Sequence, residues 1–335
     1  MTDRLGFGLI GASTISREWM IDAIRASGVA HPVAVFSRDR TRGERFASET
    51  GIAKVYDSLA AMLADPTIGA VYIASTNERH HDEVLACAGA GKHVLCDKPL
   101  ALTLDDTAAM IAACDRAGVV FATNHHLRNA ATHIAIRQAV SSGRIGRPVV
   151  ARVAHGSLLP KHLQTWRIAG DAGAGAALDL TVHDADLLRF LLDDEFVRVS
   201  AMTANSGMAG GTTEDTVVTT LMSARGTIGQ FQDVFNAPYS EGRVEIHGTE
   251  GSIIGRNVMS QAPAGSVTIV DADGVHELSI DHENLYVRGI RRFVAAIAGT
   301  DVVPSSGLDG SRSLAIALAA LESSRTGRAV EIAAQ

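Results

Sequence analysis

Several features that define particular protein classes are scarce in this sequence. Cysteine occurs only as Cys87, Cys96 and Cys114, an odd number without paired metal spacing, which suits a reducing cytoplasm better than a disulfide framework. No uncharged apolar run approaches the roughly 18 residues of a membrane span, and the first residues show no signal-peptide pattern. The net charge of −7 disfavours a broad nucleic-acid surface. We therefore expect a cytoplasmic protein with neither a membrane nor a nucleic acid as partner.

The hydrophobic pattern divides the 335 residues into two regions of different character. Short apolar runs alternate with helical patterns in the first, and predict strands at 5–10, 31–36, 54–56, 70–74, 94–96 and 119–122. Strands joined by helices form a doubly wound parallel sheet. Later strands at 149–155, 215–221, 226–235, 243–247 and 251–254 alternate polar and apolar residues, and predict an open, mostly antiparallel sheet. The expected fold is α/β for residues 1–123 and α+β for 124–335, with C-terminal helices able to pack back on the first domain.

The first strand leads into a turn that resembles a dinucleotide-binding loop. Gly11 can form the tight turn, while Ser13 and Ser16 stand where the G-x-G-x-x-G pattern has its second and third glycines. Serine is small and can donate a hydrogen bond to phosphate beside a helix N-terminus. An ordinary strand-to-helix turn with a serine cap remains the alternative.

The second strand ends at residues suited to a 2′-phosphate. Ser37 can donate a hydrogen bond, and Arg38 and Arg42, one helical turn apart, can neutralise phosphate oxygens. This favours NADP(H). Asp39 keeps NAD open, since NAD-binding chains place an acid near this point for the ribose hydroxyl; it is otherwise a helix cap.

A third candidate, Lys98, follows the apolar run 94–96. Pro99 keeps Lys98 in extended geometry, so the lysine should end the strand, and a cis Lys98–Pro99 bond is plausible. Thr103 is expected to cap the next helix. Ligands of open α/β sheets bind beyond the carboxyl ends of strands, which makes Lys98 a candidate for chemistry rather than a solvated charge.

In the second region, a helical segment carries Asp179, His183 and Asp186 at spacings that allow all three to share one face. A carboxylate one turn from a histidine can fix its tautomer and favour its protonated form, which suits a proton donor. A surface ion pair is the alternative. The pairs His80–His81 and His125–His126 do not predict a metal site, because adjacent histidines rarely reach one ion.

Taken together, these residues resemble the glucose–fructose oxidoreductase/inositol dehydrogenase (Gfo/Idh/MocA) family along essentially the whole chain. The motifs that carry the resemblance are Gly11-Ala-Ser, Asn77-x-x-His80, Asp97-Lys98-Pro99 and Asp179-x-x-x-His183-x-x-Asp186. The resemblance implies an N-terminal Rossmann domain and a C-terminal substrate-binding domain, whose open sheet often serves as an oligomer face. It also implies catalytic roles for Lys98, Asp179 and His183.

The resemblance further implies a set of cofactor-binding residues. These are Gly11, Ala12, Ser13, Thr14, Ile15, Ser37, Arg38, Arg42, Ser75, Thr76, Asn77, His80, Asp97, Lys98, Asn124, Trp166, Arg167 and Tyr286. Two positions depart from the family pattern. Asp97 replaces the usual glutamate and shortens the side chain at the ribose contact, and Ser16 replaces a residue that is more often glycine or alanine.

Within the family, four stretches, 13–19, 123–129, 163–167 and 247–252, are most similar to enzymes that reduce 1,5-anhydro-D-fructose. The implied reaction is NADPH-dependent reduction of this cyclic sugar ketone to 1,5-anhydro-D-mannitol, with NADH as a weaker cofactor and no metal. An NAD(P)-dependent inositol or sugar dehydrogenase is the alternative within the family. A nonenzymatic NADP-sensing coregulator is the alternative from another class, and would not need the proton-transfer groups.

Overall fold

The computed structural model describes residues 4–170 and 172–333. Residues 1–3, on which the absence of a signal peptide partly rests, lie outside these ranges. The chain divides into two compact units. The first contains the residues up to His126 together with Asn284–Ser311, and the second contains Leu127–Glu283 and the residues from Arg312 onward. In the described part of the chain, no helix is both long enough and apolar enough to cross a membrane.

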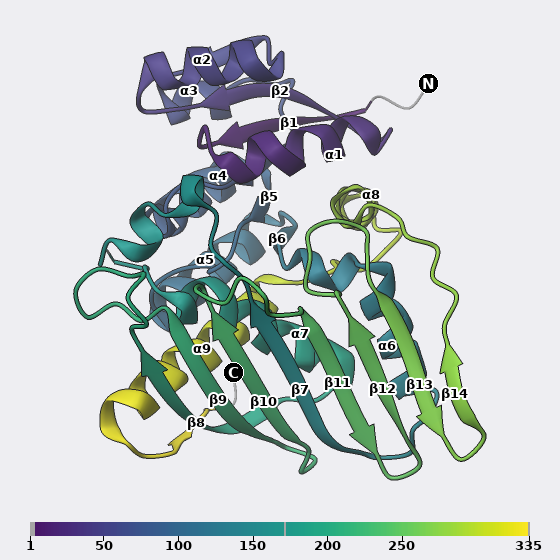
Figure 1. Ribbon diagram of the computed structural model, residues 1–335. Coiled ribbons are helices and arrows are strands. Elements are labelled where there is room, and N and C mark those ends of the chain that lie inside the picture. Colours follow the sequence, from purple (N-terminus) through teal and green to yellow (C-terminus); the bar gives the residue numbers. More distant parts are fainter. Residues whose placement is uncertain (1–3, 171, 334–335) are drawn as a thin grey trace. The chain divides into compact units, whose positions relative to one another are not determined.

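A parallel six-stranded sheet with the order β3-β2-β1-β4-β5-β6 forms the centre of the first unit (Figure 1). Its strands are β1 (Leu5–Ile10), β2 (Ala30–Phe36), β3 (Lys54–Tyr56), β4 (Ala70–Ile73), β5 (His93–Cys96) and β6 (Phe121–Thr123). All four residues of β4 are buried, as expected for a strand covered on both faces. The strand order reverses between β1 and β4, which is the position where doubly wound sheets bind ligands.

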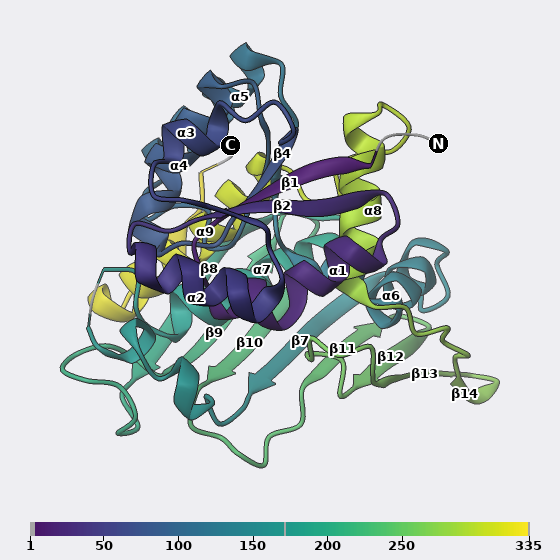
Figure 2. The ribbon, with the colours of Figure 1, turned by 90° about the horizontal axis from the view of Figure 1, so that it is seen from above.

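The helices of the first unit are α1 (Ile21–Ala26), α2 (Arg40–Thr50), α3 (Leu59–Leu63), α4 (His80–Gly89), α5 (Leu104–Ala117) and α8 (Leu285–Ile297). A π-helical turn at Ser16–Met20 precedes α1. The predicted cap is confirmed at Thr103, which accepts a hydrogen bond from the Asp106 N–H at 3.1 Å. Helix α8 comes from the late segment and lies beside α1 (Figures 1 and 2), where Phe293 packs against Phe7 of β1 at 6.0 Å between ring centroids.

The second unit contains a nine-stranded sheet with the order β14-β13-β12-β11-β7-β10-β9-β8-β15. Its strands are β7 (Pro148–Gly156), β8 (Phe196–Ala204), β9 (Thr216–Ser223), β10 (Ile228–Val234), β11 (Arg243–Gly248), β12 (Gly251–Arg256), β13 (Ser266–Asp271), β14 (Gly274–Glu277) and β15 (Val330–Glu331). The β7–β10 pair is parallel and the other pairs are antiparallel, which confirms the predicted mostly antiparallel sheet and adds one parallel pair to it.

Three helices cover one face of this sheet: α6 (Ala131–Ser141), α7 (Val182–Leu192) and α9 (Gly307–Thr326), the last continuing from the first unit. Ile136, Leu188 and Ile316 of these helices join inward-facing strand residues such as Phe231 in one buried cluster. Within the described ranges, no helix of this unit covers the opposite face (Figure 1). The strand residues on that face alternate with the buried ones. The layers therefore expose one sheet face and place α7 on the other.

Candidate functional site

The turn after β1 has the backbone geometry that a dinucleotide loop needs. Gly11 has a φ of +100°, and a Cβ at this position would lie 2.9 Å from the carbonyl oxygen of Ala74. Glycine is therefore required here. The Ser13 hydroxyl donates to the Ser16 hydroxyl at 2.8 Å, directly before the π-helical turn. Small side chains and helical N–H groups at this point fit the pyrophosphate of a dinucleotide.

The turn after β2 places a guanidinium against that loop. Arg42 donates to the carbonyl oxygen of Ala12 from Nη2 at 2.9 Å and from Nε at 3.2 Å. Asp39 is the N-cap of α2 and accepts from the Arg42 N–H at 3.0 Å, while the Ser37 hydroxyl donates to the Asp39 carbonyl at 2.8 Å. The predicted spacing of one helical turn between Arg38 and Arg42 is wrong, because α2 begins only at Arg40.

Polar residues also follow β4. The Ser75 hydroxyl donates to the Glu83 carboxylate at 2.6 Å, and burial raises the pKa of that carboxyl group. The Thr76 hydroxyl is hydrogen-bonded to the Glu78 side chain. Asn77 is buried beside them in a short 3-10 turn. This segment therefore lines the carboxyl edge of the parallel sheet, as expected for the predicted cofactor residues 75–77.

Lys98 leaves the carboxyl end of β5 on a firmly held backbone. The Lys98–Pro99 peptide bond is cis, as the sequence suggests. His80 Nδ1 lies 3.0 Å from the Pro99 carbonyl oxygen, and burial lowers the pKa of this imidazole, so the ring is neutral and can donate to that oxygen. The partly buried Asp97 carboxyl has a raised pKa because of desolvation, and Asn124 Nδ2 donates to it at 3.4 Å. His80 and Asp97 thus flank the turn that presents Lys98.

Tyr286 of α8 enters the first unit as part of an aromatic stack. Its ring lies 5.7 Å from that of Trp19 and 5.0 Å from that of His126, close to parallel with both. Its hydroxyl group is buried and has no hydrogen-bond partner among the described residues. A buried polar atom in this state can accept or donate to a bound molecule, which fits the predicted role of Tyr286 in cofactor binding.

In the second unit, the helix that carries the predicted proton donor begins with a π-helical turn at Ala177–Thr181 and continues as α7. Asp179 Oδ2 accepts from Arg167 Nε at 3.2 Å, and the Arg167 guanidinium lies 4.7 Å above the ring of Trp166. Residues 166 and 167, predicted as cofactor contacts, are therefore joined to a residue predicted as catalytic.

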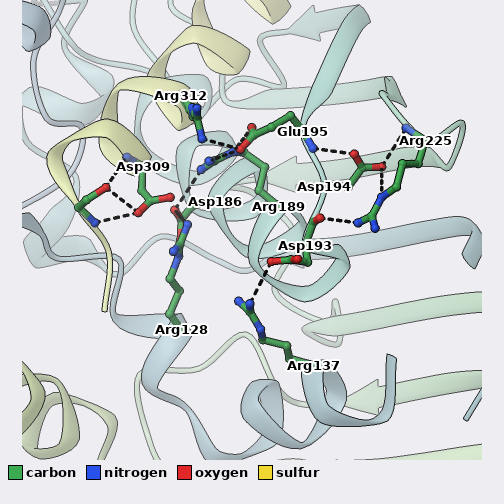
Figure 3. Close-up of polar contacts among 11 residues, drawn as sticks. Arg128, Arg137, Asp186, Arg189, Asp193, Asp194, Glu195, Arg225, Asp309 and Arg312 are labelled. Atoms are coloured by element: carbon green, nitrogen blue, oxygen red, sulfur yellow. Dashed lines mark hydrogen bonds and ion pairs between the residues drawn. The ribbon is translucent and has the colours of Figure 1, made fainter. Parts of the chain in front are cut away.

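Asp186 has a different environment from the other two residues of its motif. Its two carboxylate oxygens accept from Arg128 Nε and Nη2, both at 2.7 Å, in a buried bidentate ion pair (Figure 3). Arg189 approaches the same carboxylate at 3.7 Å and binds Glu195. Asp186 is thus held in an ion-pair network in the middle of α7.

Three further residues near His183 were not singled out from the sequence. His155 of β7 lies with its ring 6.2 Å from that of His183, and its Nδ1 is 2.9 Å from Asp184 Oδ1. His155, Asp184 and Asp233 each have an atom within 4.8 Å of the others, a spacing that can also hold a metal ion. The alternation of polar and apolar residues along β10 could have identified Asp233 as a buried acid, since it points to the same side of the strand as the buried Gly229 and Phe231.

Comparison with known proteins assigns the chain to a family. The model for the oxidoreductase family's NAD-binding Rossmann fold matches residues 5–125, and that for the GFO/IDH/MocA C-terminal domain matches residues 133–254. The 1,5-anhydro-D-fructose reductase of Ensifer adhaerens is 49% identical over 97% of this chain and 98% of its own length. The myo-inositol 2-dehydrogenase of Thermotoga maritima is 28% identical over 98% of this chain and 97% of its own length.

The solved structures include a levoglucosan dehydrogenase in complex with NADH and levoglucosan. It superposes with a TM-score of 0.88 at 25% identity, covering 99% of this chain and 100% of that one. The Rossmann sheet, the open mixed sheet and the similarity along the whole length agree with one another. The chain belongs to the Gfo/Idh/MocA family of oxidoreductases, whose N-terminal domain is an NAD-binding Rossmann fold.

Proposed function

We propose that this protein reduces the C2 ketone of 1,5-anhydro-D-fructose with NADPH and forms 1,5-anhydro-D-mannitol. The observation that carries the proposal is the 49% identity, over 97% of the chain, to a 1,5-anhydro-D-fructose reductase. The chain also has the lysine, aspartate and histidine that reduction of a carbonyl group needs. An inositol or sugar dehydrogenase activity is the alternative, since a 28% identical relative is a myo-inositol 2-dehydrogenase.

The residues divide the work of carbonyl reduction among them. NADPH, when bound, supplies the hydride. His183 donates a proton to the alkoxide oxygen that forms as the ketone is reduced. Lys98 stabilises the negative charge on that oxygen through its ammonium group. Asp179 accepts hydrogen bonds from sugar hydroxyls and, through its pairing with Arg167, is held in position for them.

NADPH is the proposed cofactor because of the turn after β2. Asp39, the acid that could bind a ribose hydroxyl, has one carboxylate oxygen engaged as the cap of α2. Ser37, Arg38 and Arg42 are the phosphate-binding groups available nearby, and Arg42 already contacts the loop after β1. The proposed cellular setting is the reducing cytoplasm, since all three cysteines are buried thiols.

The test is an assay of NADPH oxidation with a panel of sugar ketones and inositols, using the wild-type enzyme, His183→Ala and Lys98→Met. Each substitution should reduce kcat by about 10²- to 10⁴-fold, and His183→Ala should leave NADPH binding, measured by fluorescence titration, unchanged. His276→Ala, which removes a half-exposed histidine of β14, is the matched control and should retain full activity. Wild-type rates in both catalytic variants would refute the assignment.

A further inference from the structure

The carboxyl pair of Asp184 and Asp233 lies against His155 on the helix-covered face of the second sheet. His155 and Asp233 are opposite one another in the parallel β7–β10 pair, and both fall in the phase of their strands that faces the core. Asp184 reaches them from α7. The sheet register and the helix thus bring an imidazole and two carboxyl groups together, and neither carboxyl group has any exposed surface.

Each carboxyl group uses one oxygen for a conventional hydrogen bond. Asp184 Oδ1 is bonded to His155 Nδ1 at 2.9 Å, and Asp233 Oδ2 accepts from the Thr181 hydroxyl at 2.5 Å. The other two oxygens, Asp184 Oδ2 and Asp233 Oδ1, are buried and have no conventional partner among the described residues. Two buried carboxylates with facing oxygens repel each other unless a proton or a cation lies between them.

A proton explains this arrangement better than a metal ion. His155 Nδ1 is already committed to Asp184, so the cluster offers an ion at most two carboxylate oxygens and His155 Nε2, whereas structural Zn²⁺ takes four ligands and Mg²⁺ six. Burial raises the pKa of Asp184 to about 7 and that of Asp233 well above its ordinary value. Asp233 therefore keeps its proton at and above neutral pH, and Asp184, which faces the imidazole N–H, carries the single negative charge of the pair once it ionises near pH 7.

We propose that His155, anchored by the singly protonated Asp184–Asp233 pair, is a positioning residue that favours the protonated form of the proton donor His183. This inference rests on the proposed function of His183. The Asp184 carboxylate holds the N–H of His155 on Nδ1, which leaves Nε2 as an acceptor. With its ring 6.2 Å from that of His183, His155 can accept from the protonated donor through one bridging water.

No proton leaves the carboxyl pair in this scheme. When His183 transfers its proton to the substrate alkoxide, it becomes neutral and recovers a proton from solvent before the next turnover. His155 keeps the same tautomer throughout, since the charge on Asp184 does not change. The pair acts only by fixing the direction of the hydrogen bonds between itself and His183.

Other charged groups on the same and neighbouring elements have partners of their own. Asp179, at the start of the helix, is paired with Arg167, and Asp186 is paired with Arg128. Glu214, which precedes β9, accepts from the Ala177 N–H at 3.0 Å. Burial is the main cause of the raised pKa of both carboxyl groups, and Thr181 and His155 act in the opposite direction on the pKa of Asp233.

The direct test is a histidine-selective NMR titration of His183, assigned by its loss in His183→Gln. In His155→Phe the titration midpoint of His183 should fall by about one pH unit. Asp184→Asn should lower it in the same direction, because the charge that fixes His155 is lost. Asp233→Asn should leave the midpoint where it is in the wild type, since the amide N–H₂ replaces the shared proton and still donates to Asp184.

His155→Gln provides the conservative variant, because the amide of the glutamine can donate to Asp184 and accept a hydrogen bond on its other side. The titration midpoint of His183 in this variant should lie between those of the wild type and His155→Phe. The His276 resonance and the far-UV spectrum report whether each variant is folded. An unchanged His183 midpoint in folded His155→Phe or His155→Gln would overturn the proposal. So would an Asp233→Asn shift as large as that of Asp184→Asn, or one zinc or manganese ion per chain retained by the purified wild-type protein.

Kinetics supply the second readout. The high-pH limb of kcat for ketone reduction should move to lower pH in His155→Phe, while KM for the sugar stays within twofold. If His155 had only a structural role, His155→Phe would lower the amount of active enzyme without moving the high-pH limb of the kcat profile. If the wild-type protein reduces no sugar ketone, the proposed function fails, but the NMR titration still decides whether His155 acts on His183.

Discussion

At the scale of single residues, Asp184 and Asp233 make stability depend on pH. Burial raises the pKa of Asp184 to about 7 in the folded protein, from an ordinary value of 3.8. The folded state therefore binds more protons than the unfolded state between these values, and the free energy of unfolding falls as pH rises through this window. The stabilising effect of the bound proton is complete below about pH 4 and lost above about pH 7.

We predict that Asp184→Asn removes this dependence. The wild-type protein should lose up to about 1.4 kcal/mol per pH unit relative to the variant between pH 4 and pH 7, because one fewer group titrates in the variant. Urea unfolding at intervals across this range measures the difference. A constant difference between the two proteins would mean that Asp184 is already ionised at the low end of the range.

The proposed preference for NADPH rests on Arg38 and Arg42 at the same scale. We predict that Arg38→Ala with Arg42→Ala weakens NADPH binding by about tenfold or more, because a charge-assisted hydrogen bond contributes roughly 1.5–3 kcal/mol. NADH binding should change far less, since NADH has no 2′-phosphate. Arg45→Ala on the exposed side of α2 is the control and should affect neither. Equal losses for both cofactors in fluorescence titrations would contradict the 2′-phosphate site.

At the scale of elements, the middle of α7 is fixed by buried ion pairs. Arg128 and Asp186 have side chains that are 9% and 2% exposed, and Arg189 binds Glu195, which also accepts from Arg312 at the second unit's end of α9 (Figure 3). Charges at such burial are costly without their partners. This network therefore holds α7, and with it His183, at a defined position on the sheet of the second unit.

We predict that Asp186→Ala lowers the free energy of unfolding by about 3–5 kcal/mol, because it leaves the Arg128 guanidinium buried without its carboxylate. Glu322→Ala removes an ion pair with Arg325 on the exposed surface of α9 and should cost less than about 1 kcal/mol. Urea denaturation followed by circular dichroism compares the two. A similar small loss in both variants would show that solvent relaxes around Arg128.

The elements that the sequence predicts best are those whose pattern is local. The apolar run 70–73 has only one favourable environment, a strand covered on both sides, and it forms β4. Predicted strand boundaries are wrong where contacts with other elements decide them. A strand is expected from residue 119, but the Val119 N–H donates to the Cys114 carbonyl oxygen at the end of α5, and β6 begins only at Phe121. The π-helical turn at 177–181 has no sequence signature that distinguishes it from an α-helical start.

The candidate site divides in the same way. Gly11 and Lys98 could be recognised because a turn and a strand end are local features. The contact between His155 and Asp184 could not, because residues 29 positions apart meet only through the packing of α7 on β7. The spacing of Asp179, His183 and Asp186 on one helix face predicted a role for Asp186, which instead forms an ion pair with Arg128. The carboxyl group that contacts His155 belongs to the neighbouring Asp184.

At the scale of the whole molecule, the uncovered sheet face of the second unit suggests self-association. Met202, 81% exposed, is opposite Val218 in the β8–β9 pair, and Met222 is opposite Ile228 in the β9–β10 pair. These four side chains are exposed on three neighbouring strands. Exposed apolar residues that gather on one face mark interaction surfaces. We propose that this face joins copies of the chain.

Light scattering coupled to gel filtration tests that proposal. The wild-type protein should have a mass that is a multiple of 35.1 kDa, and Met202→Glu with Val218→Glu should yield the monomer, because two carboxylates would be buried at the interface. Val302→Glu, at an exposed valine of the first unit, is the matched control and should leave the mass unchanged. A wild-type monomer at high concentration would rule out this use of the sheet.

The proposed reaction is the transfer of a hydride from NADPH to the C2 ketone of a cyclic sugar. The most direct measurement is the reduction of 1,5-anhydro-D-fructose with NADPH that carries deuterium at one face of C4, followed by NMR of the product. We expect 1,5-anhydro-D-mannitol with deuterium at C2 for one of the two labelled cofactors, and no such product from His183→Ala. Absence of deuterium at C2 with both labelled cofactors, or an unchanged rate in His183→Ala, would contradict it.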